Sequence, residues 1–149
     1  MALCKIKLGK QKKLFLGNLN AKRDWGHAKD YVEMQWRILQ QKKPDDFVVA
    51  TGEAYSVKQF IEAASKILKF KILWKGKGLK EECYLINNNK KELLIKIDKK
   101  YFRPNEVEYL KGDAKKAFKT LKFKPKFSFQ DLVKDMIDSD LKLAKKELI

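Results

Sequence analysis

Two arginines and one glutamate offer the clearest chemistry in this sequence. Arg23 stands in a glycine- and asparagine-bearing stretch over residues 16–31, and Arg103 stands in the run 101–107, where Glu106 follows three residues later. The chain has 35 basic residues, but only three of them are arginines. A guanidinium pairs with phosphate through a planar fork that a lysine ammonium lacks. Because two of the three arginines fall in these segments, the sequence indicates a phosphate-binding site.

The residue types around the two arginines suit a nucleoside diphosphate. We expect Arg23 to lie in a turn between a short apolar strand and a long amphipathic helix, where it reaches a diphosphate oxygen. Arg103 would contact the other side of the diphosphate, and Glu106 would accept hydrogen bonds from ribose hydroxyls. Asn18 offers a donor and an acceptor near the first turn. These four are the candidate substrate-binding residues.

Internal ion pairs are the alternative explanation for the same arginines. Each arginine has carboxylates nearby along the chain, and a surface ion pair needs no ligand. The candidate acidic partners are Asp24 or Asp30 for the first arginine and Glu106 or Asp98 for the second. Spacing alone leaves both explanations open.

The net charge leaves nucleic acid open as a partner. The chain of 149 residues carries a formal net charge of +16, and lysine clusters can neutralise a phosphate backbone. Most lysines, however, lie on the polar faces of expected helices, which favours a lysine-rich surface. We therefore expect no nucleic-acid partner and keep a basic nucleic-acid-binding protein as an alternative.

The histidine and cysteine content and the short apolar runs argue against a metal site, a disulfide framework and a membrane span. His27 is the only histidine, so we expect no metal site. Cys4 and Cys83 show no paired spacing, which predicts buried thiols in a reducing cytoplasm rather than a disulfide framework. No apolar run is long enough to span a membrane, and lysines interrupt the N-terminus where a signal peptide would need an apolar run.

Short strands and helices alternate along the chain, which predicts an α/β or α+β fold. Strands are expected at residues 13–16, 47–50, 71–74 and 93–97. Helices are expected at residues 1–8, 27–41, 56–68 and 114–121, and from Ser128 onward. This number of strands is low for a self-contained doubly wound sheet. Residues 1–149 are therefore expected to form a single region that is part of something larger.

The chain lacks the motifs of a self-contained enzyme. Gly76-Lys77-Gly78 is the only GxG, and the third glycine of a dinucleotide loop would fall at Glu81. None of the five tyrosines is followed four residues later by a lysine, so a Tyr-xxx-Lys pair is absent. No Walker A motif or hydrolase triad is present either. We expect no catalytic and no cofactor-binding residues in this chain.

Several blocks together resemble the GDP-mannose 4,6-dehydratases, which are extended short-chain dehydrogenases. The blocks are Gly17-Asn18 with residues 23–32, then Trp36, Gln40-Gln41, residues 44–53, residues 55–57, residues 101–107, Leu110, Gly112-Asp113 and Lys116-Ala117. The resemblance runs along nearly the whole chain. The sequence departs from the family pattern at Cys83, at residues 85–92 and at residues 121–125, which affects loop details rather than the arginine segments.

The resemblance implies a fold and a function for the chain. The fold would be the C-terminal, substrate-binding part of a Rossmann-type α/β fold, with the N-terminal dinucleotide-binding strands missing. The family uses NADP to convert GDP-mannose to GDP-4-keto-6-deoxymannose. By resemblance Arg23 and Arg103 would bind the diphosphate of GDP-mannose and Glu106 the guanosine ribose, while Asn18 carries over less directly.

The resemblance also implies partners. The chain alone would bind no NADP and would be inactive without an N-terminal dehydratase half, and the complete protein would be a homo-oligomer. A nucleotide-binding module without chemistry, or a relic, is the alternative.

Overall fold

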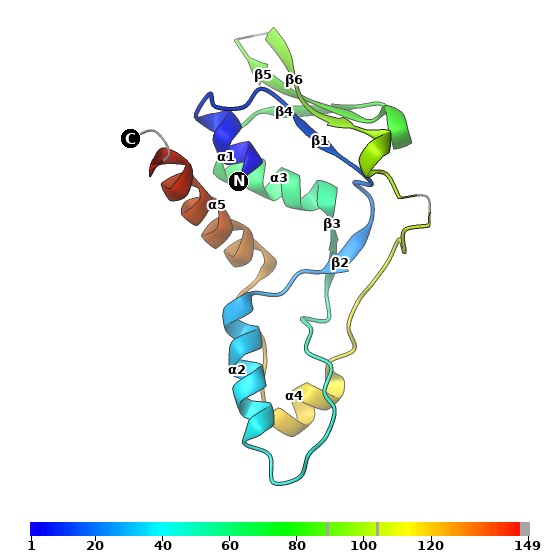
Figure 1. The fold of residues 1–149 in the computed structure, drawn as a ribbon, viewed down its shortest axis with the longest axis vertical. Coiled ribbons are helices and arrows are strands. Elements are labelled where there is room, and N and C mark those ends of the chain that lie inside the picture. The colour runs from blue at the N-terminus through cyan, green and yellow to red at the C-terminus, as the bar shows by residue number, and fades with distance from the viewer. Residues whose placement is uncertain (89, 104, 147–149) are drawn as a thin grey trace.

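A four-stranded sheet forms one end of the molecule (Figure 1). The computed structural model describes residues 1–88, 90–103 and 105–146. The strand order is β1 (Leu14–Leu16), β6 (Lys90–Ile97), β5 (Glu82–Asn87) and β4 (Ile72–Lys75). β1 runs parallel to β6, whereas β6, β5 and β4 are antiparallel to their neighbours. The parallel pair matters for the site, because the carboxyl ends of both strands reach the same edge of the sheet.

Three helices lie against one face of this sheet (Figure 1). They are α1 (Ala2–Lys7), α3 (Val57–Ile67) and α5 (Phe129–Lys146). The last two begin where the sequence predicts a cap: the Ser56 hydroxyl accepts from the Gln59 N–H, and the Ser128 hydroxyl accepts from the Asp131 N–H. Their apolar stripes close the main core, which includes Ile61, Ala64, Cys83, Ile95, Val133 and Ile137.

A second, smaller lobe extends away from the sheet. The α2–α4 lobe, as we call it, consists of α2 (Ala28–Leu39), the segment 40–50 and α4 (Lys115–Leu121) (Figure 1). Its core is the cluster Met34, Ala117, Leu121 and Phe123. Arg37 of α2 joins the two helices: its Nη1 donates to the carbonyls of Leu121 (3.0 Å) and Lys122 (3.1 Å), and its Nε and Nη2 donate to Glu33. The third arginine therefore has a structural role.

A short two-stranded ribbon connects the sheet to the lobe. β2 (Lys22–Asp24) pairs antiparallel with β3 (Ala54–Ser56), so that Arg23 lies opposite Tyr55. Two short 3₁₀ turns, η1 (Gly78–Lys80) and η2 (Lys99–Tyr101), follow β4 and β6.

The structure confirms the α/β class and most of the predicted elements. The five predicted helices correspond to α1–α5, and three of the four predicted strands correspond to β1, β4 and β6. The prediction of a turn at Arg23 is wrong, because residues 22–24 form β2. The predicted strand at 47–50 is also wrong, since this segment pairs with no other strand of the described chain. The sequence prediction missed β5, in which the buried Cys83 and Leu85 alternate with less buried neighbours as in a half-buried strand.

Gly17 lets the end of β1 approach η2, and a substitution there should be costly. A Cβ at this position would lie 2.1 Å from the carbonyl oxygen of Tyr101. We expect Gly17→Ala to lower the free energy of unfolding by about 2–3 kcal/mol, as overpacking does. Urea denaturation measures the change. Gly9→Ala is the matched control: Gly9 has a φ of +73° but nothing within 4 Å of a Cβ, so backbone strain alone should cost about 1 kcal/mol. Equal losses would show that the close approach to Tyr101 is unimportant.

Both cysteines should be unreactive in the folded chain. Cys4 and Cys83 are fully buried, and burial raises the pKa of both thiols, that of Cys83 to about 12. The raised pKa values favour the protonated thiols, and burial blocks access to them, so little of the reactive thiolate is available to a reagent. We expect a chromogenic disulfide reagent at pH 8 to label neither thiol until guanidinium unfolds the chain. The exposed variant Ser139→Cys should react at once, and fast labelling of the unmutated chain would contradict the burial.

Candidate functional site

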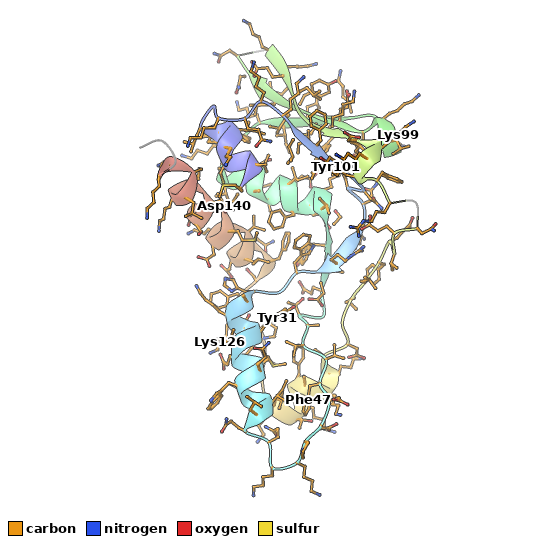
Figure 2. All side chains as sticks on the ribbon, in the orientation of Figure 1. Tyr31, Phe47, Lys99, Tyr101, Lys126 and Asp140 are labelled. Atoms are coloured by element: carbon orange, nitrogen blue, oxygen red, sulfur yellow. The ribbon has the colours of Figure 1, made fainter. Side chains whose placement is uncertain are left out.

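The end of β1 and the segment after β6 meet at one edge of the sheet. The Asp98 N–H donates to the Leu16 carbonyl (2.9 Å), which extends the parallel pairing by one residue. Gly17 then passes close to the carbonyl of Tyr101, which Figure 2 shows at this end of the sheet. The two contacts bring Asn18 next to Phe102, and both line a cavity of about 220 Å³.

The strand β2 and the segment 106–110 form a second contact between the same two parts of the chain. The Lys22 N–H donates to the Glu108 carbonyl (2.7 Å), and the Leu110 N–H donates to the Lys22 carbonyl (3.0 Å). This short parallel pairing places the side chain of Arg23 beside Glu106. Residues more than 80 positions apart in the sequence are thus adjacent.

Arg23 is held firmly in this arrangement. Its Nη1 donates to the carbonyls of Lys22 and Val107, both at 2.8 Å, and its Nη2 pairs with the Glu106 carboxylate at 3.0 Å. The Arg23 and Glu106 side chains are 29% and 23% exposed, so solvent still reaches the pair. A guanidinium has five N–H donors, and two of those of Arg23, Nε–H and one on Nη2, have no partner within the described chain.

The sequence-based alternative, in which Arg23 pairs with Asp24 or Asp30, is wrong, because both aspartates bind other groups. Asp24 instead accepts from the N–H and hydroxyl of Thr51 and from the Gly52 N–H, all within 2.9 Å. The buried carboxylate of Asp30 accepts from the N–H groups of Lys126 and Phe127 at 3.1 Å. Both aspartates thus fix loops rather than neutralise the arginine.

Arg103 is exposed, and its guanidinium makes no hydrogen bond or ion pair with the described residues. The acids considered as its partners are engaged elsewhere: Glu106 pairs with Arg23, and Asp98 accepts from the Lys100 N–H (2.9 Å). The Glu106 N–H donates weakly to the Arg103 carbonyl (3.3 Å), which keeps the backbones of these two residues close together. The backbone of Arg103, whose guanidinium has no partner within the described chain, is therefore next to that of Glu106, the partner of Arg23.

Asn18 shapes the turn in which it lies. Its Oδ1 accepts from the Asn20 N–H (2.9 Å), which is a typical Asx turn. Sequence analysis did not single out Asn20 or Glu108, which line the same cavity. Asn20 follows Asn18 at the spacing of an Asx turn, which is a usable sequence signal for that residue, whereas Glu108 has no such local signal.

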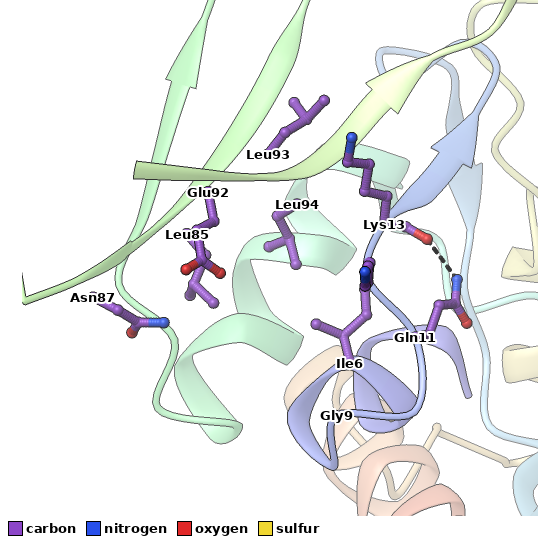
Figure 3. Close-up of a pocket in the computed structure, with 10 residues that line it drawn as sticks. Ile6, Gly9, Gln11, Lys13, Leu85, Asn87, Glu92, Leu93 and Leu94 are labelled. Atoms are coloured by element: carbon purple, nitrogen blue, oxygen red, sulfur yellow. Dashed lines mark hydrogen bonds between the residues drawn. The ribbon is translucent and has the colours of Figure 1, made fainter. Parts of the chain in front are cut away.

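A larger cavity lies away from these residues. It measures about 550 Å³ and opens between the loop 9–13 and the far ends of β5 and β6 (Figure 3). β1 pairs only with residues 95–97 of β6, so within the described residues the preceding part of β6 has no strand neighbour on this side. Ile6, Leu85 and Leu94 line this cavity, and none of the four predicted site residues reaches it. Within the described ranges, no cluster of acidic, histidine or cysteine side chains is arranged to hold a metal, and no helix is long and apolar enough to cross a membrane.

Solved structures define the class of fold. RMD from Pseudomonas aeruginosa complexed with NADPH aligns with a TM-score of 0.73 at 17% identity, over 95% of this chain and 40% of that one. UDP-glucose 4-epimerase from Bifidobacterium longum, in complex with NAD⁺ and UDP, aligns with a TM-score of 0.67 at 18% identity, over 94% and 38%. The fold is thus that of part of an extended short-chain dehydrogenase.

Sequence relatives narrow the class to one family. The family model for GDP-mannose 4,6 dehydratase matches residues 1–136. The chain is 49% identical to the GDP-mannose 4,6 dehydratase of Dictyostelium discoideum over 140 residues, and 44% identical to that of Homo sapiens over 144 residues. These matches cover 94% and 97% of this chain, but only 39% and 38% of the relatives. The chain belongs to the GDP-mannose 4,6-dehydratase family and spans about two fifths of the length of these members.

The Arg23–Glu106 pair should contribute measurably to stability. Glu106→Gln removes the charge but keeps the shape, and we expect the free energy of unfolding to fall by about 1 kcal/mol, the usual value for a partly exposed pair. Glu108→Gln is the matched control, because its carboxylate has no ion pair within the described residues. Denaturation at low and high salt tests this: the loss for the Glu106 variant should shrink with salt. Equal effects of the two variants would contradict a specific pair.

Proposed function

We propose that this chain is the substrate-binding part of a GDP-mannose 4,6-dehydratase, over residues 1–149 as a single region. In this role it holds the nucleotide diphosphate of GDP-mannose. The observation that carries the proposal is the exposed Arg103, unpaired within the described chain, whose backbone carbonyl accepts from the N–H of Glu106, the partner of Arg23. Family membership and the activity for which the relatives are named support GDP-mannose as the ligand.

Each side chain has a separate task in this proposal. Arg103 binds one phosphate through its planar fork. Arg23 binds the other phosphate through its two remaining donors, because the Lys22, Val107 and Glu106 oxygens already fix its position. Glu106 accepts from the ribose hydroxyls with Oε2, since only Oε1 is engaged by Arg23. Asn18, at the carboxyl end of β1, orients the same ligand.

The chemistry of the dehydratase depends on groups that this chain lacks. NADP supplies the hydride transfer in the complete protein, as the complex of RMD with NADPH supports for a related fold. No Tyr-xxx-Lys pair and no dinucleotide loop occur in the sequence. We therefore propose that the chain is inactive alone and works with an N-terminal dehydratase half, in a homo-oligomer. Its two buried free thiols favour a reducing compartment, the cytoplasm.

Binding of GDP tests the proposal directly. Isothermal titration of the chain with GDP and with GDP-mannose should show saturable binding, and Arg103→Lys and Arg23→Lys should each weaken it at least tenfold, because lysine cannot pair bidentately with phosphate. Arg37→Lys is the matched control: it alters the remaining arginine, which joins α2 to α4, and should leave the affinity unchanged. Absence of heat with both ligands, or equal losses for all three variants, would refute the assignment.

A further inference from the structure

A cavity of about 480 Å³ lies where the β2–β3 ribbon meets the link between α4 and α5, the elements that Figure 1 labels. It shares no lining residue with the cavity at Asn18, and Arg23, Arg103 and Glu106 do not line it. Its volume falls within the range of about 300–1,000 Å³ that is usual for small-molecule sites. The proposed nucleotide site therefore leaves this cavity unused.

Aromatic rings dominate the wall of this cavity. Five of its twelve lining residues within the described chain are aromatic, whereas aromatic residues make up only 11% of the sequence. The cavity of about 550 Å³, by contrast, has no aromatic lining residue. The five are Trp25, Tyr55, Phe118, Phe127 and Phe129. Such a concentration of rings favours a ligand that offers a flat apolar surface.

Contacts within the protein hold two of these rings in place. Trp25 packs on Phe60 with the ring centroids 5.0 Å apart, and its Nε1 donates to the Tyr55 carbonyl (2.9 Å). The Tyr55 ring stacks on Phe129 with centroids 4.0 Å apart and an angle of 7° between the ring planes. A ligand in the cavity thus meets rings that are already ordered, which lowers the entropic cost of binding.

Charged groups of both signs surround the rings. Glu53 and Lys124 line the cavity, and neither has an ion pair within the described chain. Asp131 and Lys126 line it as well but are engaged. Asp131 caps the start of α5, and the Lys126 ammonium pairs with Glu33 at 2.6 Å. An anion would be repelled by the carboxylates and a cation by the ammonium groups, so this wall favours a neutral ligand whose hydroxyls both donate and accept.

We propose that this cavity binds a neutral pyranose, either a free monosaccharide or the end of an oligosaccharide. The carbon-bound hydrogens on one face of a pyranose are slightly positive and are attracted to the negative face of an aromatic ring. Glu53 accepts from a sugar hydroxyl with Oε1, since the Tyr55 hydroxyl engages only Oε2 (2.5 Å), and Lys124 donates to another hydroxyl. None of the residues assigned to the nucleotide takes part, so the sugar site goes beyond the proposed function.

Nuclear magnetic resonance of the whole chain tests the sugar site. The Trp25 indole belongs to the cavity wall, whereas Trp36 and Trp74 do not line the cavity and serve as internal references. Titration with D-mannose, D-glucose and mannobiose should shift the Trp25 indole signal saturably and leave the other two in place. Mannose 6-phosphate and protonated mannosamine, which each add one kind of charge, should bind at least fivefold more weakly than mannose. Tighter binding of mannobiose than of mannose would identify an oligosaccharide as the source of the pyranose.

Two cavity variants, each with a matched control, test the contacts. Phe118→Leu removes a ring of the wall and keeps an apolar side chain, and Phe15→Leu makes the same change at an exposed ring outside the cavity. Glu53→Ala removes the free carboxylate oxygen, and Glu92→Ala removes an exposed carboxylate elsewhere. Each cavity variant should weaken mannose binding at least fivefold, and each control should leave it unchanged. Glu53 is exposed, so its variant keeps the test valid even if Phe118→Leu fails to fold.

The possible outcomes separate the sugar site from the proposed function. No saturable shift at Trp25, tighter binding of either charged sugar than of mannose, or equal losses for cavity variants and controls would overturn it. Saturating GDP should leave the mannose affinity unchanged. Competition by GDP-mannose would also overturn a separate site, because it would assign the cavity to the hexose of the nucleotide sugar. Loss of GDP binding with mannose binding retained would refute the nucleotide site alone.

Discussion

The parallel pairing of β1 with β6 is the contact on which the candidate site depends. It aligns Leu14–Leu16 with Ile95–Ile97, and the Asp98 N–H continues the pairing onto the Leu16 carbonyl. Beyond that point both strands have left the sheet at the same edge. Gly17, which has no side chain, then lets the backbone of η2 approach. Two segments that are distant in sequence therefore deliver their polar residues to the carboxyl ends of parallel strands, where α/β sheets commonly bind ligands.

The three arginines occupy places that lysine could not fill in the same way. Arg37 directs its donors to two carbonyls at the end of α4 and to one carboxylate. Arg23 similarly meets two carbonyls and Glu106. An arginine guanidinium can donate to several oxygens at once because its donors form a rigid planar fork, whereas a lysine ammonium is a compact point charge that fits this arrangement poorly. Arg103 has the same fork without oxygens from the described chain around it, and this difference separates it from the two structural arginines.

The α2–α4 lobe differs from the main body in how completely it is covered. The main core is closed on one face of the sheet by three helices, and each of its four strands is hydrogen-bonded to at least one neighbouring strand. The lobe has only a small core, an exposed stripe on α2 and an extended segment without backbone partners. The lobe thus leaves apolar surface uncovered within the described chain, in a family whose members compared above are more than twice as long.

The sequence by itself determined the elements whose signals are local. Helical periodicity and the caps at Ser56 and Ser128 predicted α3 and α5, because a capping hydroxyl and an apolar stripe act within a few residues. Family blocks identified Arg23, Arg103 and Glu106 as the residues to examine. The local pattern failed at 47–50, where the residues have strand character but the described chain holds no strand to pair with them, since a strand, unlike a helix, takes its hydrogen bonds from elsewhere.

Only the tertiary structure decided which charges meet. Sequence spacing suggested neighbours such as Asp24 and Asp30 for Arg23, yet both carboxylates bind backbone N–H groups of distant loops. The actual partner, Glu106, comes into reach through the β1–β6 and β2 contacts. Charge pairing acts over a few ångströms in space and is indifferent to sequence distance, so the free state of Arg103 and the engaged state of Arg23 followed from the topology alone.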